Sequence, residues 1–340
     1  MAPAVVGGPI VFSRHDPATD DTFCFTIDPS GANEAKGHAG ACGPPSPDGS
    51  KILTTVYQPS GFGPLVGGRP ATTNPDGSGF TLLDAYPGDA INISCGYWSP
   101  DGLRFLCESG GDGNPADDGI YTMRSSDGGD RVRITQAPAG HEDQPQGYSP
   151  DGSKILFARL SDTEPSAEYV VNTDGKGLVR LSPANLWTAD FVSTADWSPD
   201  GHQVVFASAI EGGGHPGLYV VDADGTGLHQ IASPDVGGPS AQWSPDGRWI
   251  ASSTCLRCKP QLFVIHPDGS GIVTLTNGAD GSTSLTPIWS PDGSRLLYQS
   301  QQPDGHVTIR TMRPDGTDQA QVADVGTDLS TYSWGAARTP

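Results

Sequence analysis

The sequence predicts an all-β fold, a seven-bladed β-propeller made of four-stranded blades. Two repeated turn signals and the pairing of the two chain ends lead to this prediction. The first signal is the tetrapeptide Ser-Pro-Asp-Gly, which recurs at intervals of 53, 50, 49, 46 and 46 residues and begins at Ser46, Ser99, Ser149, Ser198, Ser244 and Ser290. A fixed period near 50 residues is typical of propellers and solenoids.

Each Ser-Pro-Asp-Gly segment has the composition of a tight hairpin turn. Proline presets the backbone dihedral of the first turn residue, aspartate suits the next, and glycine takes the left-handed conformation that ends the turn. Apolar runs such as "KILFA" and "QVVFA" follow, and an aromatic residue precedes five of the six segments: Trp98, Tyr148, Trp197, Trp243 and Trp289. We therefore expect the first and second strands of a blade around each turn, with these aromatic residues in the core between blades.

A second turn signal occurs seven times, in segments such as "YVVNTDGKG", "LYVVDADGTG" and "LFVIHPDGSG". It predicts a third strand, a turn, and a fourth strand such as "LVRLS" or "IVTLT". Four short strands in each repeat make one propeller blade.

The two chain ends complete the count of seven blades. Residues 9–14, "PIVFSR", have the pattern of a strand that follows a Ser-Pro-Asp-Gly turn, and residues 331–335, "TYSWG", have that of a strand that precedes one. We expect these strands to pair, so that blade 1 is shared between residues 9–37 and 328–335. A C-terminal strand that joins the N-terminal blade closes the ring and removes exposed sheet edges. The prediction is one propeller domain spanning residues 1–340.

The repeated "WSPDG" resembles the TolB-like, WD-repeat-like propeller repeat of bacterial proteins over essentially the whole chain. TolB itself has six blades and an N-terminal α/β domain, and the sequence shows neither. Peptidases of the prolyl oligopeptidase class carry similar propellers ahead of a hydrolase domain. Because the sequence contains no G-x-S-x-G nucleophile elbow, we do not expect that hydrolase activity.

The net charge of −20 comes largely from turn chemistry. Twelve of the 39 acidic residues lie in repeated Asp-Gly turns, which leaves 27 acids against 19 bases, a balance of −8. This balance still argues against nucleic acid or anionic lipid as a partner, because both would be repelled. No run of 18 apolar residues occurs, so we expect no membrane span.

The six cysteines favour an oxidising compartment. Cys255 and Cys258 lack a second ligand pair at zinc spacing, which favours a local disulfide. Cys95 and Cys107 flank one turn symmetrically and are candidates for a bond across the hairpin, with Cys42 as the alternative partner of Cys95. The start "MAPAVVGGPI" does not have the pattern of a signal peptide. The expectation is a secreted or periplasmic monomer whose leader is absent from this sequence.

Residues that break the repeat are the candidate site, because propeller function usually resides in irregular loops. His38, His141 and Asp190 each precede their Ser-Pro-Asp-Gly serine by eight residues. We expect them at comparable height around the channel mouth, where His38 and His141 are candidate ligands for a divalent cation, calcium or manganese. The competing interpretation is that they are solvated loop residues. Acid-rich loops "HDPATDD" and "GGDGNPADDG" are further candidates for calcium.

Further candidates for ligand binding are Trp187, Asp190, Asp196 and Gln242, together with Glu142 and Asp143, which follow His141. Trp187 stands outside the repeated tryptophan positions. Asp196 and Gln242 each precede a repeated tryptophan, where they either face channel water or hydrogen-bond to a neighbouring first strand.

Two functions are compatible with these residues. The first is a non-catalytic binding propeller that presents its loops and channel mouth to a protein, peptide or glycan. It is favoured because the sequence has no P-loop, dinucleotide fingerprint or zinc helix. The alternative is a metal-assisted uronate lyase, because oligogalacturonate lyases have similar seven-bladed propellers. That resemblance implies a metal site, for which His38, His141 and Gln144 are the catalytic candidates here.

Overall fold

A computed structural model describes residues 7–40, 42–58, 66–83, 93–109, 118–161, 164–183, 186–187, 195–210, 213–233, 238, 240–254, 259–327 and 331–335. These residues form 28 strands and no helix, arranged in seven antiparallel sheets. The predicted all-β, seven-bladed propeller is therefore confirmed, and we number the sheets as blades 1 to 7. Residue contacts group the chain into two compact units, residues 1–148 with 328–340 (unit 1) and residues 149–327 (unit 2).

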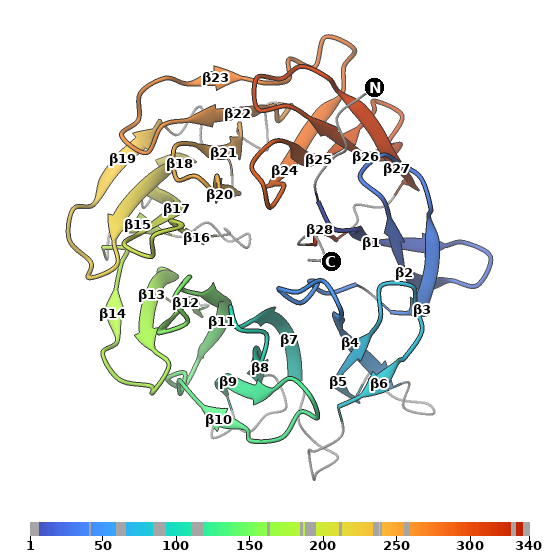
Figure 1. Cartoon of the computed structure of the whole chain (residues 1–340). Helices are drawn as coiled ribbons and strands as arrows, with labels where there is room; N and C mark the ends of the chain where they lie inside the picture. The colour runs from blue at the N-terminus through green and yellow to red at the C-terminus, as the bar shows by residue number, and fades with distance from the viewer. Residues whose placement is uncertain are drawn as a thin grey trace. The chain divides into compact units, whose positions relative to one another are not determined.

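Unit 1 contains blades 1 to 3 and the first strand of blade 4 (Figure 1). Blade 1 consists of β28 (Tyr332–Trp334), β1 (Ile10–Asp16), β2 (Asp21–Ile27) and β3 (Ala35–Ala39). Blade 2 consists of β4 (Ile52–Gln58), β5 (Val66–Thr73) and β6 (Thr81–Leu82). Blade 3 consists of β7 (Ile93–Trp98), β8 (Arg104–Ser109), β9 (Gly119–Arg124) and β10 (Val132–Arg133), and blade 4 begins with β11 (His141–Tyr148).

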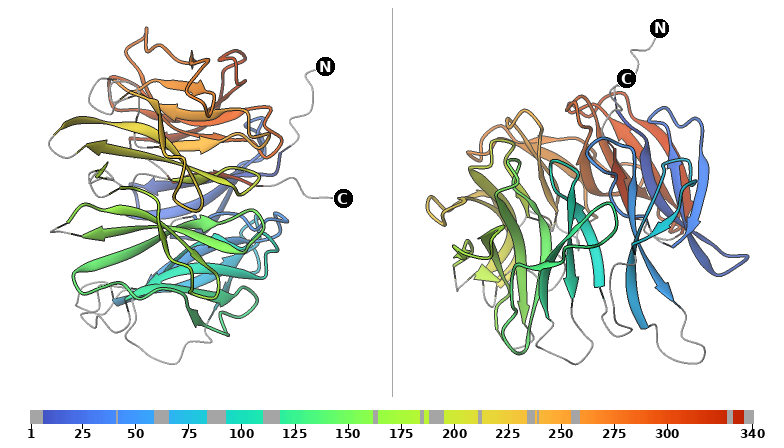
Figure 2. Two further views of the ribbon diagram at one scale, coloured as in Figure 1. Left: turned by 90° about the vertical axis from the view of Figure 1, so that its left-hand side faces the viewer. Right: turned by 60° about the horizontal axis from the view of Figure 1, so that its bottom comes forward.

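Unit 2 contains the remaining strands, and its sheets follow one another as separate twisted layers (Figure 2). Blade 4 continues with β12 (Lys154–Ser161), β13 (Ala167–Asn172) and β14 (Val179–Arg180). Blade 5 has β15 (Leu186–Trp187), β16 (Asp196–Trp197), β17 (Gln203–Ile210), β18 (Gly213–Asp222) and β19 (His229–Ala232). Blade 6 has β20 (Ala241–Trp243), β21 (Ile250–Ser253), β22 (Leu262–Ile265) and β23 (Val273–Thr274). Blade 7 has β24 (Thr283–Trp289), β25 (Leu296–Gln301), β26 (Val307–Met312) and β27 (Ala320–Gly326).

The last strand of the chain pairs with the first, as the sequence predicts. β28 runs antiparallel to β1 with Ile10 opposite Trp334 and Phe12 opposite Tyr332, and the pair lies together in Figure 1. A side-chain bond between the Ser13 and Thr331 hydroxyls, 2.7 Å long, extends the pairing beyond the ladder. The C-terminal strand therefore completes the N-terminal blade.

A buried serine hydroxyl organises each Ser-Pro-Asp-Gly turn. In all six turns it donates to the Oδ1 atom of the aspartate two residues later, at 2.6 Å. The same hydroxyl accepts the backbone N–H of the fifth residue after it, at 2.9 Å. The serine bond lowers the pKa of the aspartates, that of Asp151 to about 2. The motif recurs because serine, aspartate and glycine each have a separate role in the hairpin.

The same turns also set the approach of neighbouring blades. The turn glycines have left-handed φ values, 71° at Gly247 and 69° at Gly293, which side-chain-bearing residues adopt only with strain. A Cβ atom built on Gly293 would lie 3.6 Å from Cδ of Pro245 in the preceding turn, and Gly247 stands in the same relation to Pro199, at 3.8 Å. Turn residues of one blade thus pack against those of the blade before it.

Three of the repeated tryptophans lie in the core, as expected, whereas Trp98 and Tyr148 are half-buried. Trp197, Trp243 and Trp289 are each 6% exposed, and each joins an apolar cluster that draws on two consecutive blades of unit 2. Trp289, for example, packs with Leu262 of blade 6 and Met312 of blade 7. Burial of such large side chains provides the main apolar stabilisation between sheets.

Asp196 and Gln242 bond consecutive first strands to one another. The Asp196 carboxylate accepts the backbone N–H of Trp243 at 2.8 Å, and the Gln242 amide oxygen accepts that of Trp289 at 2.6 Å. Although part of the Asp196 side chain is accessible, burial of its carboxyl group raises the pKa from 3.8 to about 7, against the opposing effect of its backbone hydrogen bonds. An acid and an amide thus perform one structural function in successive blades.

Two disulfides lie in unit 1. Cys95 of β7 and Cys107 of β8 are cross-strand partners and are bonded, which is the pairing that their symmetrical placement about the turn suggests. The alternative of Cys42 with Cys95 is not formed, because Cys42 is bonded to Cys24 of β2. Cys255 and Cys258 lie outside the described residues.

Replacement of a turn serine tests the role of the buried hydroxyl. We expect Ser290→Ala to lower the free energy of unfolding by roughly 1–2 kcal/mol, because Asp292 loses a donor and the Arg295 N–H loses an acceptor. Ser294→Ala is the matched control, because the Ser294 hydroxyl also donates to Asp292 but from an exposed position; it should change the free energy of unfolding by less than about 0.5 kcal/mol. Equal effects in urea unfolding would contradict the assigned role.

The pH dependence of stability tests the Asp196 bond. Because its folded-state pKa lies above the ordinary value of 3.8, its favourable contribution is complete below pH 3.8 and is lost as the pH rises to about 7. Asp196→Asn retains an oxygen acceptor for Trp243. The unfolding free energy of the variant relative to wild type should therefore increase across that window, with a slope of up to about 1.4 kcal/mol per pH unit. A pH-independent difference would contradict this assignment.

Candidate functional site

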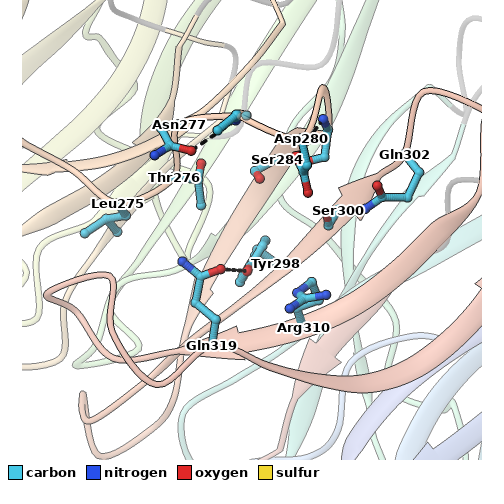
Figure 3. Close-up of a pocket in the computed structure, with 13 residues that line it drawn as sticks. Leu275, Thr276, Asn277, Asp280, Ser284, Tyr298, Ser300, Gln302, Arg310 and Gln319 are labelled. Carbon is cyan, nitrogen blue, oxygen red and sulfur yellow. Dashed lines mark hydrogen bonds between the residues drawn. The ribbon is translucent and has the colours of Figure 1, made fainter.

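A polar pocket of about 300 Å³ lies within unit 2, between blades 6 and 7 (Figure 3). One wall is the segment that joins the two blades, which includes Thr276, Asn277 and Asp280. The other wall is one face of blade 7, with Ser284 of β24, Tyr298 and Ser300 of β25, and Arg310 of β26, flanked by Gln302 and Gln319.

Strand alternation places these side chains on one face of the blade 7 sheet. Tyr298 and Ser300 are two residues apart in β25, so both project to the same side. The register sets Ser284 opposite Ser300 and Arg310 opposite Tyr298. Near the Ser290 turn this face is apolar, and at the opposite end, where the connecting loops lie, it becomes polar. The pocket therefore occupies the irregular-loop end of the blade.

Tyr298 forms the floor of the pocket and is 1% exposed. Its hydroxyl donates to Oε1 of Gln319 at 3.2 Å, and Figure 3 shows Gln319 and Arg310 on either side of it. Burial raises the pKa of Tyr298, while the nearby Arg310 guanidinium acts in the opposite direction. The tyrosine is therefore neutral at physiological pH, and its hydroxyl proton is engaged in the hydrogen bond to Gln319.

Several other groups in the pocket remain available to a ligand. Ser284 and Ser300 are 3% and 4% exposed, yet their hydroxyls make no hydrogen bond to the described residues, and neither does the amide of Gln302. Arg310 forms no ion pair within the described part of the chain. Asp280 acts on Arg310 only at longer range, because its Oδ1 atom accepts both the N–H and the hydroxyl of Ser282.

Arg310 occupies a position that is aromatic in most other blades. The eighth residue after each Ser-Pro-Asp-Gly serine has a cross-strand partner in the third strand, and these partners are Ala71, Tyr121, Tyr169, Tyr219, Phe263 and Arg310. In blades 4 and 5 the aromatic partner stacks on a phenylalanine, with ring centroids 5.4 and 5.8 Å apart. Alignment of the third strands would have singled out Arg310 from the sequence.

The structure does not place His38 and His141 in equivalent positions. His38 lies in β3, the fourth strand of blade 1, where its ring is 5.9 Å from that of Phe80. His141 begins β11, a first strand. The shared sequence offset fails because Pro44 and Pro45 lack N–H donors and leave the first strand of blade 2 as a single bridge to Ile52. The chain ahead of these prolines forms β3 instead.

The residues that follow His141 lie along β11. Glu142 is exposed and accepts a bond from Nε2 of Gln144 at 3.2 Å, whereas Asp143 is only 1% exposed. The sequence did not single out Glu108 of β8. Burial, and secondarily the charge of Glu142, raises the pKa of Glu108 to about 7. Two carboxyl groups of unit 1 are thus electrostatically coupled.

The remaining candidate residues either bond one strand to another, lie in a strand or turn away from the pocket, or are outside the described residues. Asp196 and Gln242 use their acceptors to bond first strands together. Trp187 lies in β15 opposite Ala209, and Asp190 is outside the described residues. In "HDPATDD", Asp16 accepts the N–H of Ala18 within the hairpin turn, and most of "GGDGNPADDG" is not described. Within the described ranges no three His, Cys, Asp or Glu side chains are grouped as metal ligands.

Comparison with known proteins identifies the repeat. A family model described as the TolB beta propeller domain matches residues 188–335. Dipeptidyl-peptidase 5 of Porphyromonas endodontalis is 35% identical over 95 residues, which are 26% of this chain and 13% of that protein. A TolB homolog of Chlorobium luteolum is 24% identical over 272 residues, which are 78% of this chain and 57% of that protein. The chain thus spans less than two thirds of the length of either relative.

Solved structures agree with the fold. TolB from Acinetobacter baumannii has a TM-score of 0.57 at 17% identity, covering 93% of this chain and 79% of that chain. Oligogalacturonate lyase from Vibrio parahaemolyticus has a TM-score of 0.53 at 16% identity, covering 81% and 73%. At these identities the likeness concerns the fold alone. The repeated turn, the seven sheets and the family match over residues 188–335 together show a propeller of the TolB-like kind.

Proposed function

We propose that the chain is a non-catalytic binding propeller whose pocket between blades 6 and 7 takes a small polar molecule, or the polar end group of a peptide or glycan. One observation carries the proposal. Ser284, Ser300, Gln302 and Arg310 converge on a cavity of about 300 Å³ with hydrogen-bonding capacity that the described protein does not use.

Such an arrangement favours binding for a physical reason. Polar groups with little exposure are normally satisfied within the protein or by ordered water. In this pocket a ligand can replace water while restoring the same hydrogen bonds. All four groups lie on or directly after strands of one sheet, so little conformational entropy is lost when they engage a ligand.

The ionisable groups of the pocket support binding rather than acid–base chemistry. A general acid or base works best with a pKa near the working pH. Hydrogen bonds from Ser282 lower the pKa of Asp280, and burial raises the pKa of Tyr298. Both shifts move these groups away from neutrality, so neither exchanges a proton readily near pH 7.

The two disulfides support a further part of the proposal, an extracytoplasmic location. Cys24–Cys42 and Cys95–Cys107 would persist in an oxidising compartment, either the periplasm or the exterior of the cell. Among the described residues no helix has the length and apolarity needed to cross a membrane.

A bulky residue at the pocket wall tests the binding proposal. Ala279 lines the pocket and is exposed, so Ala279→Trp should cover its mouth without disturbing the core. Ligand-observed NMR on monosaccharides, sugar acids, amino acids and dipeptides should find at least one compound that binds wild type and loses at least tenfold in affinity in this variant. Ala139→Trp, at an exposed turn of unit 1, is the matched control and should bind normally. A binder unaffected by Ala279→Trp, or a screen without binders, would refute the proposal.

A further inference from the structure

Resting on the proposed function, we infer that the ligand of this pocket carries a carboxylate group, which Arg310 receives. The compounds that fit are small acids with additional hydroxyl or amide groups, such as a sugar acid or an acylated amino acid. The inference depends on the identity of residue 310, on its lack of a counter-ion, and on the kinds of donor around it.

Blade 7 has an arginine at position 310, where blades 4 and 5 have a tyrosine, and this difference leaves room for the pocket. Where blades 4 and 5 place Tyr169 and Tyr219 against a stacked phenylalanine, blade 7 places Arg310 against Tyr298. A flexible guanidinium does not fill the inter-blade space as a ring does. The residues around Arg310 are also polar, with Ser284 and Ser300 on the adjoining strands. Blade 7 therefore has a cavity lined by the guanidinium of Arg310 where blades 4 and 5 have an aromatic contact.

The charge of Arg310 is not neutralised as those of Arg104 and Arg295 are. Arg104 and Arg295 occupy equivalent places in blades 3 and 7, and each binds an aspartate at 2.7 Å through Nη1. Arg310 has the neutral Tyr298 hydroxyl as its neighbour, and Asp280 is engaged with Ser282. In a chain with a net charge of −20, an arginine that faces a pocket whose one carboxylate among the lining residues, that of Asp280, is engaged with Ser282 is an unusual local site for an anion.

The donors in the pocket match a carboxylate. A guanidinium presents five N–H donors in a planar fork, which complements the two oxygens of a carboxylate and forms short charge-assisted bonds with them. The hydroxyls of Ser284 and Ser300 and the amide of Gln302 can then pair with hydroxyl or amide groups elsewhere on the ligand. At about 300 Å³ the cavity is at the lower end of the range for small-molecule sites, which suits a compound of monosaccharide size.

The test compares matched probes on the folded chain by isothermal titration calorimetry. D-glucuronate and D-glucose differ in the carboxylate, and N-acetylglycine and N-acetylglycinamide form the same contrast for an amino-acid source. Glucose 6-phosphate tests a different anion. We expect at least one carboxylate probe to bind wild type roughly 10- to 100-fold more tightly than its neutral partner, as a charge-assisted bidentate contact implies. The pair that shows this contrast identifies the source of the carboxylate.

Three variants of Arg310 complete the design. Arg310→Gln should remove the preference for the carboxylate over its neutral partner, and Arg310→Lys should keep part of that preference. Arg310→Tyr introduces the residue found in blades 4 and 5. It should fill the cavity, abolish binding of every probe and leave the melting temperature unchanged or higher.

The outcomes separate this inference from the proposed function. If neutral probes bind as tightly as acids and lose affinity in Ala279→Trp but not in Arg310→Gln, the pocket binds ligands and the carboxylate inference is wrong. Tighter binding of glucose 6-phosphate than of either carboxylate also overturns it, as does the absence of binding by all probes. If carboxylate binding is unaffected by both Ala279→Trp and Arg310→Gln, the proposed site itself fails.

Discussion

The hydrogen bonds of one serine hydroxyl, repeated six times, are the constraint on which the rest of the structure depends. Each buried serine ties an aspartate and a backbone N–H into the turn that joins the first two strands of a blade. The glycine of that turn then approaches the proline of the turn before it, as Gly293 approaches Pro245. The four residues of the Ser-Pro-Asp-Gly motif therefore contribute both to strand pairing within a blade and to the spacing between adjacent blades. Six of the 39 acidic residues of the chain are the aspartates of these turns.

The features that could be predicted from the sequence are those encoded locally. A turn needs a particular residue at each position, so the motif that begins at Ser290 predicts both the hairpin and the strands on either side. The pairing of β28 with β1 was predictable because each end of the chain carries half of one repeat. The Cys95–Cys107 bond was one of two pairings considered for Cys95, and it was suggested by the symmetrical placement of the two cysteines about a turn. Cys24–Cys42 was missed, because its two cysteines lie in different repeat positions and only the folded chain brings them together.

The candidate site was predicted less well, because a shared sequence offset does not imply a shared position in space. His38 and His141 precede their turns by the same number of residues, yet Pro44 and Pro45 shorten one first strand and move His38 into β3. Asp196 and Gln242 were recognised as unusual, and their bonds to neighbouring strands account for them. Arg310 was overlooked because "TIRTM" has the ordinary pattern of a third strand, and its significance emerges only against the aromatic residues that occupy the same place in other blades.

A repeat that fixes the scaffold leaves individual blades free to differ, and blade 7 has Arg310 and Tyr298 at the position where blades 4 and 5 stack two aromatic rings. The central claim is that this departure makes a binding site for a small acid. A crystal structure of the protein soaked with D-glucuronate and, in parallel, with N-acetylglycine tests it most directly. The account predicts electron density for one of these compounds between blades 6 and 7, with its carboxylate facing the guanidinium of Arg310 and its other polar groups near Ser284 and Ser300. An empty pocket beside density elsewhere on the chain, or a bound compound whose carboxylate points away from Arg310, would contradict it.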